Sequence, residues 1–178
     1  MMVMTSLAAL TRRVLSVTLA ALCLAPQVSL AGNLAAPAGE VILGVFGQVT
    51  VTNADERAEF DLAMLDALPQ RETVTSTPWH EGKHSFSGPT LASILEAVGA
   101  TGATLRISAL NDYAADMPVE DAATIPVIRA TRIDGEDISI RDKGPLFVIY
   151  PFDEQPELFN EVYFNRSVWQ VNSIQVGG

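Results

Sequence analysis

Residues 141–152 read Arg-Asp-Lys-Gly-Pro-Leu-Phe-Val-Ile-Tyr-Pro-Phe, a charged turn followed by a short apolar run. The run from Leu146 to Tyr150 is rich in β-branched and aromatic residues and lies between two prolines, which predicts a buried strand of about five residues. The turn before it carries two cations and one anion, and Gly144 would let a ligand or another backbone come close. Such a turn can hold a small polar molecule against a rigid sheet, but a plain surface turn that enters a core strand has the same pattern.

Residues 1–31 have the features of an export signal. Two arginines at 12 and 13 precede an apolar segment at 14–25, and Ser29-Leu30-Ala31 offers a small-x-small cleavage site after Ala31. The apolar segment is short for a membrane span. We therefore expect a periplasmic protein with a signal peptide at 1–31, one domain at 32–178 and no membrane insertion of the mature chain.

The same segment has features of two other kinds of export signal. Cys23 suggests a lipoprotein, but the bulky Leu22 stands before it where such sites require a small residue. The paired arginines also fit a twin-arginine signal, which would mean export after folding, often with a cofactor bound.

Charge and cysteine content narrow the classes of partner. The 178 residues include 11 Lys and Arg against 21 Asp and Glu, a formal net charge of −10, and this acidity argues against nucleic acid and anionic membrane surfaces. The single cysteine, Cys23, lies in the signal segment. The mature domain therefore has no disulfide and no thiolate metal ligand, and a small molecule or a protein is the expected partner.

The mature chain shows mostly strand patterns, with two short helices. Period-two alternation and β-branched residues predict strands at 41–51, 72–76, 104–110, 125–133, 137–140, 146–150 and 168–176. Apolar residues at helical spacing predict helices at 60–68 and from Pro89 to Gly99, and Asp134-Gly135 predicts a hairpin turn. Segments 53–59 and 152–161 are expected to be connections, and 162–164 is too short to assign. The expected fold class is α+β, a mixed, strand-dominated single domain.

Both histidines lie in the polar stretch 75–90, which we expect to be an exposed loop. His80 and His84 have the i,i+4 spacing of a metal pair on a helix. However, Pro78 and Gly82 would break a helix there, and no carboxylate has a matching spacing. The sequence therefore favours a polar loop over a metal site.

An ordered set of short motifs resembles the sulfite-oxidase-type molybdopterin-binding domain, most closely the small, free-standing exported members of that fold. The motifs are Leu68-Pro69-Gln70, Thr77-Pro78-Trp79, Phe86-Ser87-Gly88-Pro89-Thr90-Leu91, Ala109-Leu110-Asn111-Asp112-Tyr113, Met117-Pro118, Asp134-Gly135, Arg141-Asp142-Lys143-Gly144-Pro145-Leu146 and Trp169-Gln170-Val171. Each motif is weak alone, but together they cover nearly all of the mature chain in order.

The resemblance implies the fold and a pterin slot, without the metal chemistry. In catalytic members a cysteine binds molybdenum four residues before a tryptophan that matches Trp79, and this position is Thr75 here. A hydroxyl is a poor substitute for a thiolate, so molybdenum is not expected.

Some members that resemble this chain are periplasmic pterin-binding proteins that report to a membrane protein controlling cyclic di-GMP. The resemblance thus implies a non-catalytic pterin-binding protein. Its partner would be the periplasmic domain of a diguanylate cyclase, a phosphodiesterase or a histidine kinase. A molybdopterin-dependent oxidoreductase and a ligand-free interaction module of the same fold remain the alternatives.

A pterin is a flat bicycle that needs an aromatic wall, a carboxylate for its amino edge and N–H donors for its oxo edge. The stretches that resemble the pterin side of the family offer candidates for each. The candidates are Trp79, Phe86 and Tyr113 as walls; Asp112 or Asp142 at the amino edge; Arg141, Lys143 and the backbone N–H of Gly144 at the oxo edge; and Thr77, Asn111 and Arg166 at the side chain of the pterin. Trp79 can equally be a core residue, Arg141 can pair with a surface acid, and Asp112 can cap a turn.

Overall fold

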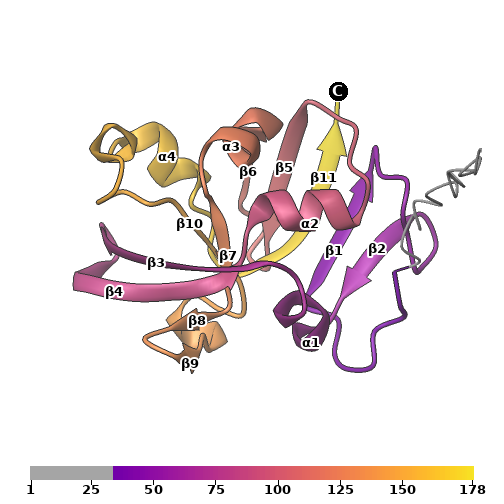
Figure 1. The fold of residues 1–178 in the computed structure, drawn as a ribbon, viewed down its shortest axis with the longest axis horizontal. Coiled ribbons are helices and arrows are strands. Elements are labelled where there is room, and N and C mark those ends of the chain that lie inside the picture. Colours follow the sequence, from indigo (N-terminus) through magenta and orange to yellow (C-terminus); the bar gives the residue numbers. More distant parts are fainter. Residues whose placement is uncertain (1–33) are drawn as a thin grey trace, which may run out of the picture.

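The computed structural model describes residues 34–178, so the predicted signal peptide and its cleavage site lie outside the described residues. Within 34–178, no helix combines the length and the apolar character that a membrane crossing requires. The described residues form a mixed, strand-dominated α+β domain, as expected from the sequence (Figure 1).

The first sheet has five strands in the order β2-β1-β11-β5-β6, and its β1–β11 pair is parallel while the other pairs are antiparallel. Its strands are β1 (Leu43–Gly47), β2 (Arg57–Phe60), β5 (Thr104–Ala109), β6 (Ala114–Pro118) and β11 (Val171–Gly177). In β5, Leu105, Ile107 and Ala109 are buried and the residues between them are more exposed, which is the alternation of a strand with one face on a core.

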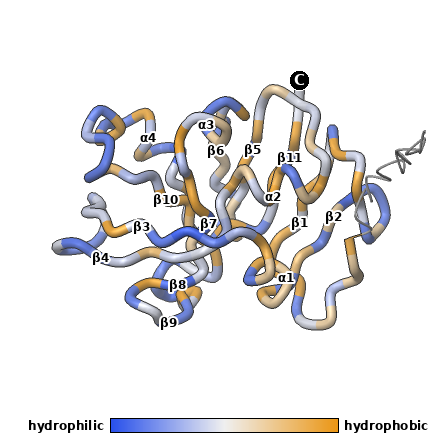
Figure 2. Tube along the Cα trace, in the orientation of Figure 1, coloured by the Kyte–Doolittle hydropathy of each residue, from blue (hydrophilic) through white to orange (hydrophobic). Residues whose placement is uncertain are grey.

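The second sheet has four strands in the order β3-β4-β8-β9. It contains a β3–β4 hairpin where the sequence predicted a loop, so that prediction was wrong. Its strands are β3 (Gln70–Thr77), β4 (His80–Pro89), β8 (Arg132–Ile133) and β9 (Glu136–Asp137). Most of the stretch 75–90, expected to be a loop, is strand, because β3 offers a backbone partner along nearly its whole length. The hairpin projects from the body of the domain, and its far end is hydrophilic (Figures 1 and 2).

The short strand β10 (Phe147–Ile149) confirms the buried strand predicted from residues 146–150. It pairs with β7 (Ile128–Ala130) and is buried on both faces. Leu146, Val148 and Tyr150 belong to the large core cluster, whereas Phe147 and Ile149 belong to a smaller one. A strand between two cores reads as a continuous apolar run, which explains the sequence pattern.

Both predicted helices are present, in shorter form. They are α1 (Leu62–Asp66) and α2 (Leu91–Ala97). Asp61 caps α1 by accepting a hydrogen bond from Met64 N, and Thr90 caps α2 by accepting one from Ser93 N. Gly99 follows α2 with a φ of +58°, as expected for its role as a stop signal.

Two further helices were not predicted, so the expectation of two helices was wrong. They are α3 (Val119–Thr124) and α4 (Glu161–Arg166), and two 3-10 turns, η1 (Ile140–Asp142) and η2 (Pro156–Leu158), also occur. Helices α3 and α4 have six residues each, too few to show a hydrophobic period.

Several predicted strand boundaries also shift. The predicted strand 41–51 is regular only as β1, because Gly47 takes a φ of +95° at its end. The predicted strand 125–133 divides into β7 and β8, and most of 137–140 is not strand because η1 begins at Ile140.

Candidate functional site

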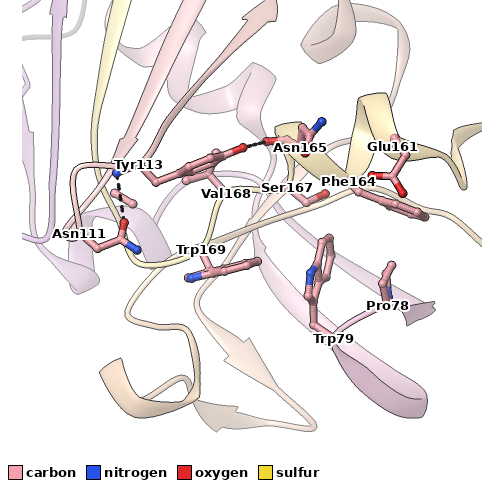
Figure 3. Close-up of a pocket in the computed structure, with 11 residues that line it drawn as sticks. Pro78, Trp79, Asn111, Tyr113, Glu161, Phe164, Asn165, Ser167, Val168 and Trp169 are labelled. Atoms are coloured by element: carbon pink, nitrogen blue, oxygen red, sulfur yellow. Dashed lines mark hydrogen bonds between the residues drawn. The ribbon is translucent and has the colours of Figure 1, made fainter.

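A pocket lies between the β3–β4 turn, the β5–β6 turn and helix α4 (Figure 3). Its volume is ≈ 410 Å³, which is within the range of about 300–1,000 Å³ typical of small-molecule sites. The lining residues are Pro78, Trp79, Ala109, Asn111, Tyr113, Glu161, Phe164, Asn165, Ser167, Val168 and Trp169.

Two tryptophans form the main aromatic surface of the pocket. The rings of Trp79 and Trp169 meet edge to face with centroids 5.8 Å apart, and Phe164 meets Trp79 at 6.0 Å. Trp79 also meets the buried ring of Phe147 at 5.5 Å. These contacts on several sides hold the Trp79 ring in place, so the pocket has an aromatic surface against which a flat ligand can pack.

Tyr113 joins the β5–β6 turn to α4 across the pocket. Its hydroxyl donates a hydrogen bond to the backbone oxygen of Asn165 at 3.0 Å, and its backbone N–H donates to Asn111 Oδ1 at 3.2 Å (Figure 3). Between them, Asp112 takes a φ of +65°, the left-handed conformation that a tight turn requires and that Asp tolerates. The turn therefore presents Asn111 and Tyr113 together.

Glu161 is the single charged side chain among the described residues that line the pocket. It is the first residue of α4 and is exposed. Asn111 and Asn165 add amide groups to the lining. The pocket thus offers aromatic surface, one carboxylate and two side-chain amides, and its described lining has no cation.

Three of the residues predicted to bind a pterin, Trp79, Asn111 and Tyr113, lie together at this pocket. The remaining candidates lie elsewhere. Asp112 is exposed at the turn without lining the pocket, and Thr77 is buried with its Oγ1 3.0 Å from His80 Nδ1. Arg166 turns to Asp121, to which its Nη1 donates at 2.9 Å.

Phe86 does not line the pocket, and neither do residues 141–144, which were predicted to donate hydrogen bonds to the pterin. Phe86 is fully buried in the small core cluster, where its ring packs as core. Arg141 and Asp142 are exposed in and beside η1, and Lys143 follows with a φ of +77°. Gly144 is buried and its N–H donates to Ser139 O at 2.7 Å, so this N–H is not free to serve a ligand.

The residues that sequence reasoning missed come mainly from α4 and the segment that follows it. Glu161, Phe164, Asn165, Ser167 and Trp169 line the pocket, and only Trp169 belonged to a motif singled out from the sequence. A signal for the helix was present in Asn160, whose side chain caps α4 by accepting from Val162 N.

Thr75, which the sequence resemblance matched to a molybdenum-binding cysteine, is not placed as a metal ligand at the pocket. Thr75 is fully buried in β3. Its Oγ1 accepts a hydrogen bond from Asp153 N at 3.0 Å and lies 3.2 Å from Ser76 O, to which it donates. The hydroxyl is therefore used within the protein, and Thr75 does not line the pocket.

The two histidines lie close together, with ring centroids 5.5 Å apart. A hydrogen bond of 2.7 Å to Asp134, together with one to Glu81 O, raises the pKa of His84. Burial, assisted by the charges of Lys143 and His84, lowers the pKa of His80. Within residues 34–178, no three His, Cys, Asp or Glu side chains gather in an arrangement that could hold a metal ion.

Comparisons with known proteins bear on the fold. No family model matches the chain, and no curated protein matches it. Among solved structures, the sulfane dehydrogenase SoxCD from Paracoccus pantotrophus matches with a TM-score of 0.58 and 18% sequence identity. The match covers 76% of this chain and 37% of that chain, so the chain spans well under half of its length. At this identity the match concerns the fold alone, and it supports the expected sulfite-oxidase-like fold.

Proposed function

We propose that this chain is a non-catalytic binding protein for a pterin, held in the pocket between Trp79, Trp169 and helix α4. The observation that carries the proposal is the pairing of a fixed aromatic surface with one carboxylate, that of Glu161, in a pocket of ≈ 410 Å³. A pterin has a flat ring system and presents an amino group and a ring N–H side by side. A carboxylate can accept both of these hydrogen bonds at once.

The free energies expected for these contacts are consistent with reversible binding. A charge-assisted hydrogen bond contributes about 1.5–3 kcal/mol, and a favourable ring contact adds about 0.5–1.5 kcal/mol beyond the burial of its area. Two or three such contacts with ring burial give roughly micromolar affinity after the cost of association. Glu161 takes the role that the sequence had given to Asp112 or Asp142, and Asn165 and Asn111 are placed to meet the polar edge or side chain of the ligand.

Metal-dependent oxidation is not part of this proposal, because the Thr75 hydroxyl accepts a hydrogen bond from Asp153 N and donates one to Ser76 O. Among residues 34–178, the lining also lacks a cation that would hold an anionic group on a larger pterin cofactor. These two features favour a free pterin over a molybdenum-loaded one.

The test begins with the purified protein. Heat-released small molecules are analysed by fluorescence and mass, and metals are measured in the same sample. Pterins are then added back and binding is followed by tryptophan fluorescence. We expect pterin without stoichiometric molybdenum, and a loss of affinity of about 10-fold or more in Glu161→Gln, which removes one charge-assisted bond.

Glu157→Gln is the matched control, because Glu157 is exposed in the neighbouring turn η2 and does not line the pocket. Its affinity should equal that of the wild type. Absence of any pterin binding would reject the proposed function, and equal loss or no loss in both variants would reject the pocket.

We further propose that the protein acts in the periplasm and reports pterin to the periplasmic domain of a membrane protein that controls cyclic di-GMP. This follows the family resemblance and the export signal at 1–31. The mature protein recovered from the periplasm should begin at Gly32, and its affinity for the partner domain should change when pterin is added. Recovery in the cytoplasm, or pterin-independent affinity, would contradict this part of the proposal.

A further inference from the structure

The guanidinium of Arg129 is buried inside the domain without an acceptor. Arg129 lies in β7 and has no exposed surface. Among residues 34–178, no atom accepts a hydrogen bond from its Nε, Nη1 or Nη2. Burial lowers the pKa of this group to about 9, which still leaves it protonated at neutral pH. The core therefore contains a positive charge with five N–H donors and no hydrogen-bond partner among residues 34–178.

The backbone on both sides holds Arg129 in this position. In the β7–β10 pair it lies opposite the fully buried Val148. On its other side β4 approaches so closely that a Cβ on Gly88 would lie 2.1 Å from the carbonyl oxygen of Arg129. Because neighbouring segments fix the backbone here, the strand cannot turn to bring the side chain to solvent.

The buried carboxylate of Asp121 is already engaged with other groups. The hydroxyl of Tyr150 donates to Asp121 Oδ2 at 2.9 Å. The same oxygen accepts from Arg166 Nη1, also at 2.9 Å. Asp121 thus balances the charge of Arg166, and one positive charge remains. Residues 1–33 contain neither Asp nor Glu, so that segment has no side-chain carboxylate to offer.

We propose that Arg129 binds a small oxyanion, of the carboxylate, nitrate, sulfate or phosphate class, inside the domain. The planar fork of a guanidinium matches two oxygens of such an anion, and this is the pairing in which arginine is strongest. The anion is small because the group is fully enclosed. Arg129 does not line the pocket between Trp79 and Trp169, so this site is separate from the proposed pterin pocket and does not depend on it.

The test is thermal unfolding of the purified protein in series of formate, nitrate, sulfate and phosphate, with ionic strength held constant by chloride. We expect at least one oxyanion to raise the unfolding midpoint saturably, by about 5–10 °C at 100 times its Kd. Arg129→Met keeps the length of the side chain and removes the fork, so its midpoint should not respond. A buried unpaired charge can often be replaced by an apolar residue without loss of stability, so this variant is expected to fold.

Arg106→Met is the matched control, because Arg106 forms an exposed pair with Asp116 on β5–β6. Its midpoint should respond to the anion as the wild type does. Arg129→Lys keeps the charge without the fork and should show a weaker response, which gives a second measurement if Arg129→Met fails to fold. A wild-type midpoint that none of the four anions raises, or an equal rise in Arg129→Met, would overturn the proposal. Pterin affinity, measured on the same samples, reports on the other site.

Discussion

The hydroxyl of Tyr150 donates a hydrogen bond to Asp121 Oδ2 at 2.9 Å, linking the end of the central strand β10 to helix α3. Both residues are buried, and Arg166 of α4 donates to the same oxygen. One carboxylate oxygen thus ties together the central strand and the two helices that sequence reasoning did not find.

Tyr150→Phe should destabilise the domain by about 1.5–3 kcal/mol, because it removes a donor from a buried charged acceptor. Tyr113→Phe is the control, since its hydroxyl bonds a backbone oxygen and the residue is 46% exposed. It should cost less than about 1 kcal/mol. Urea unfolding of both variants measures the difference. Equal losses of unfolding free energy would show that the Tyr150–Asp121 hydrogen bond stabilises the domain no more than the exposed Tyr113 hydrogen bond does.

Arg166→Met should weaken pterin binding by several-fold as well as lower stability. Arg166 is the polar anchor of α4, and that helix brings Glu161, Phe164 and Asn165 to the pocket. None of the α4 residues is fully buried, so the helix depends on such anchors for its position. Titration of pterin against this variant tests the effect. The exposed Arg106→Met variant should bind as the wild type does, and equal binding by both would show that the aromatic contacts and the Tyr113–Asn165 hydrogen bond are enough to hold α4.

The pH dependence of stability should reveal the His84–Asp134 pair. The raised pKa of His84 means that its stabilising contribution is fully present below the ordinary histidine pKa of about 6.5 and is lost as pH rises through the folded value. The pKa of Asp134 is lowered, chiefly by the same hydrogen bond, so its carboxylate stays charged across this window.

Asp134→Asn should therefore cost more stability near pH 6 than near pH 8.5. Histidine NMR titration of the same variant should show the pKa of His84 falling toward its ordinary value. His80 serves as an internal reference in the wild type, because burial moves its pKa in the opposite direction. A pH-independent cost, with His84 unmoved, would refute the role of this pair.

The sequence was most informative where a hydrophobic pattern is long enough to read. The apolar run 146–150 contains the buried strand β10 between two core clusters, and apolar residues at helical spacing located α1 and α2. The pocket was only partly predictable, because α4 has six residues and no hydrophobic period, while its neighbours decide its position. At Gly144 the prediction from the sequence was wrong. Its freedom suggested room for a ligand, whereas a Cβ there would lie 1.8 Å from Ile138 O, so the close approach is made by the protein's own backbone.

The hydroxyl of Thr75 should contribute to the stability of the fold and not to ligand binding. Thr75→Val keeps the shape and removes the acceptor for Asp153 N and the donor to Ser76 O. Leaving this partly buried backbone N–H without its protein partner should cost about 1 kcal/mol. Thr101→Val is the matched control, because its hydroxyl lies exposed with a long 3.5 Å contact to Gln48 O, and it should change stability by less than about 0.5 kcal/mol. Because Thr75 does not line the pocket, pterin affinity should be unchanged in both variants. A loss of pterin binding in Thr75→Val with stability intact would instead place this threonine at the ligand.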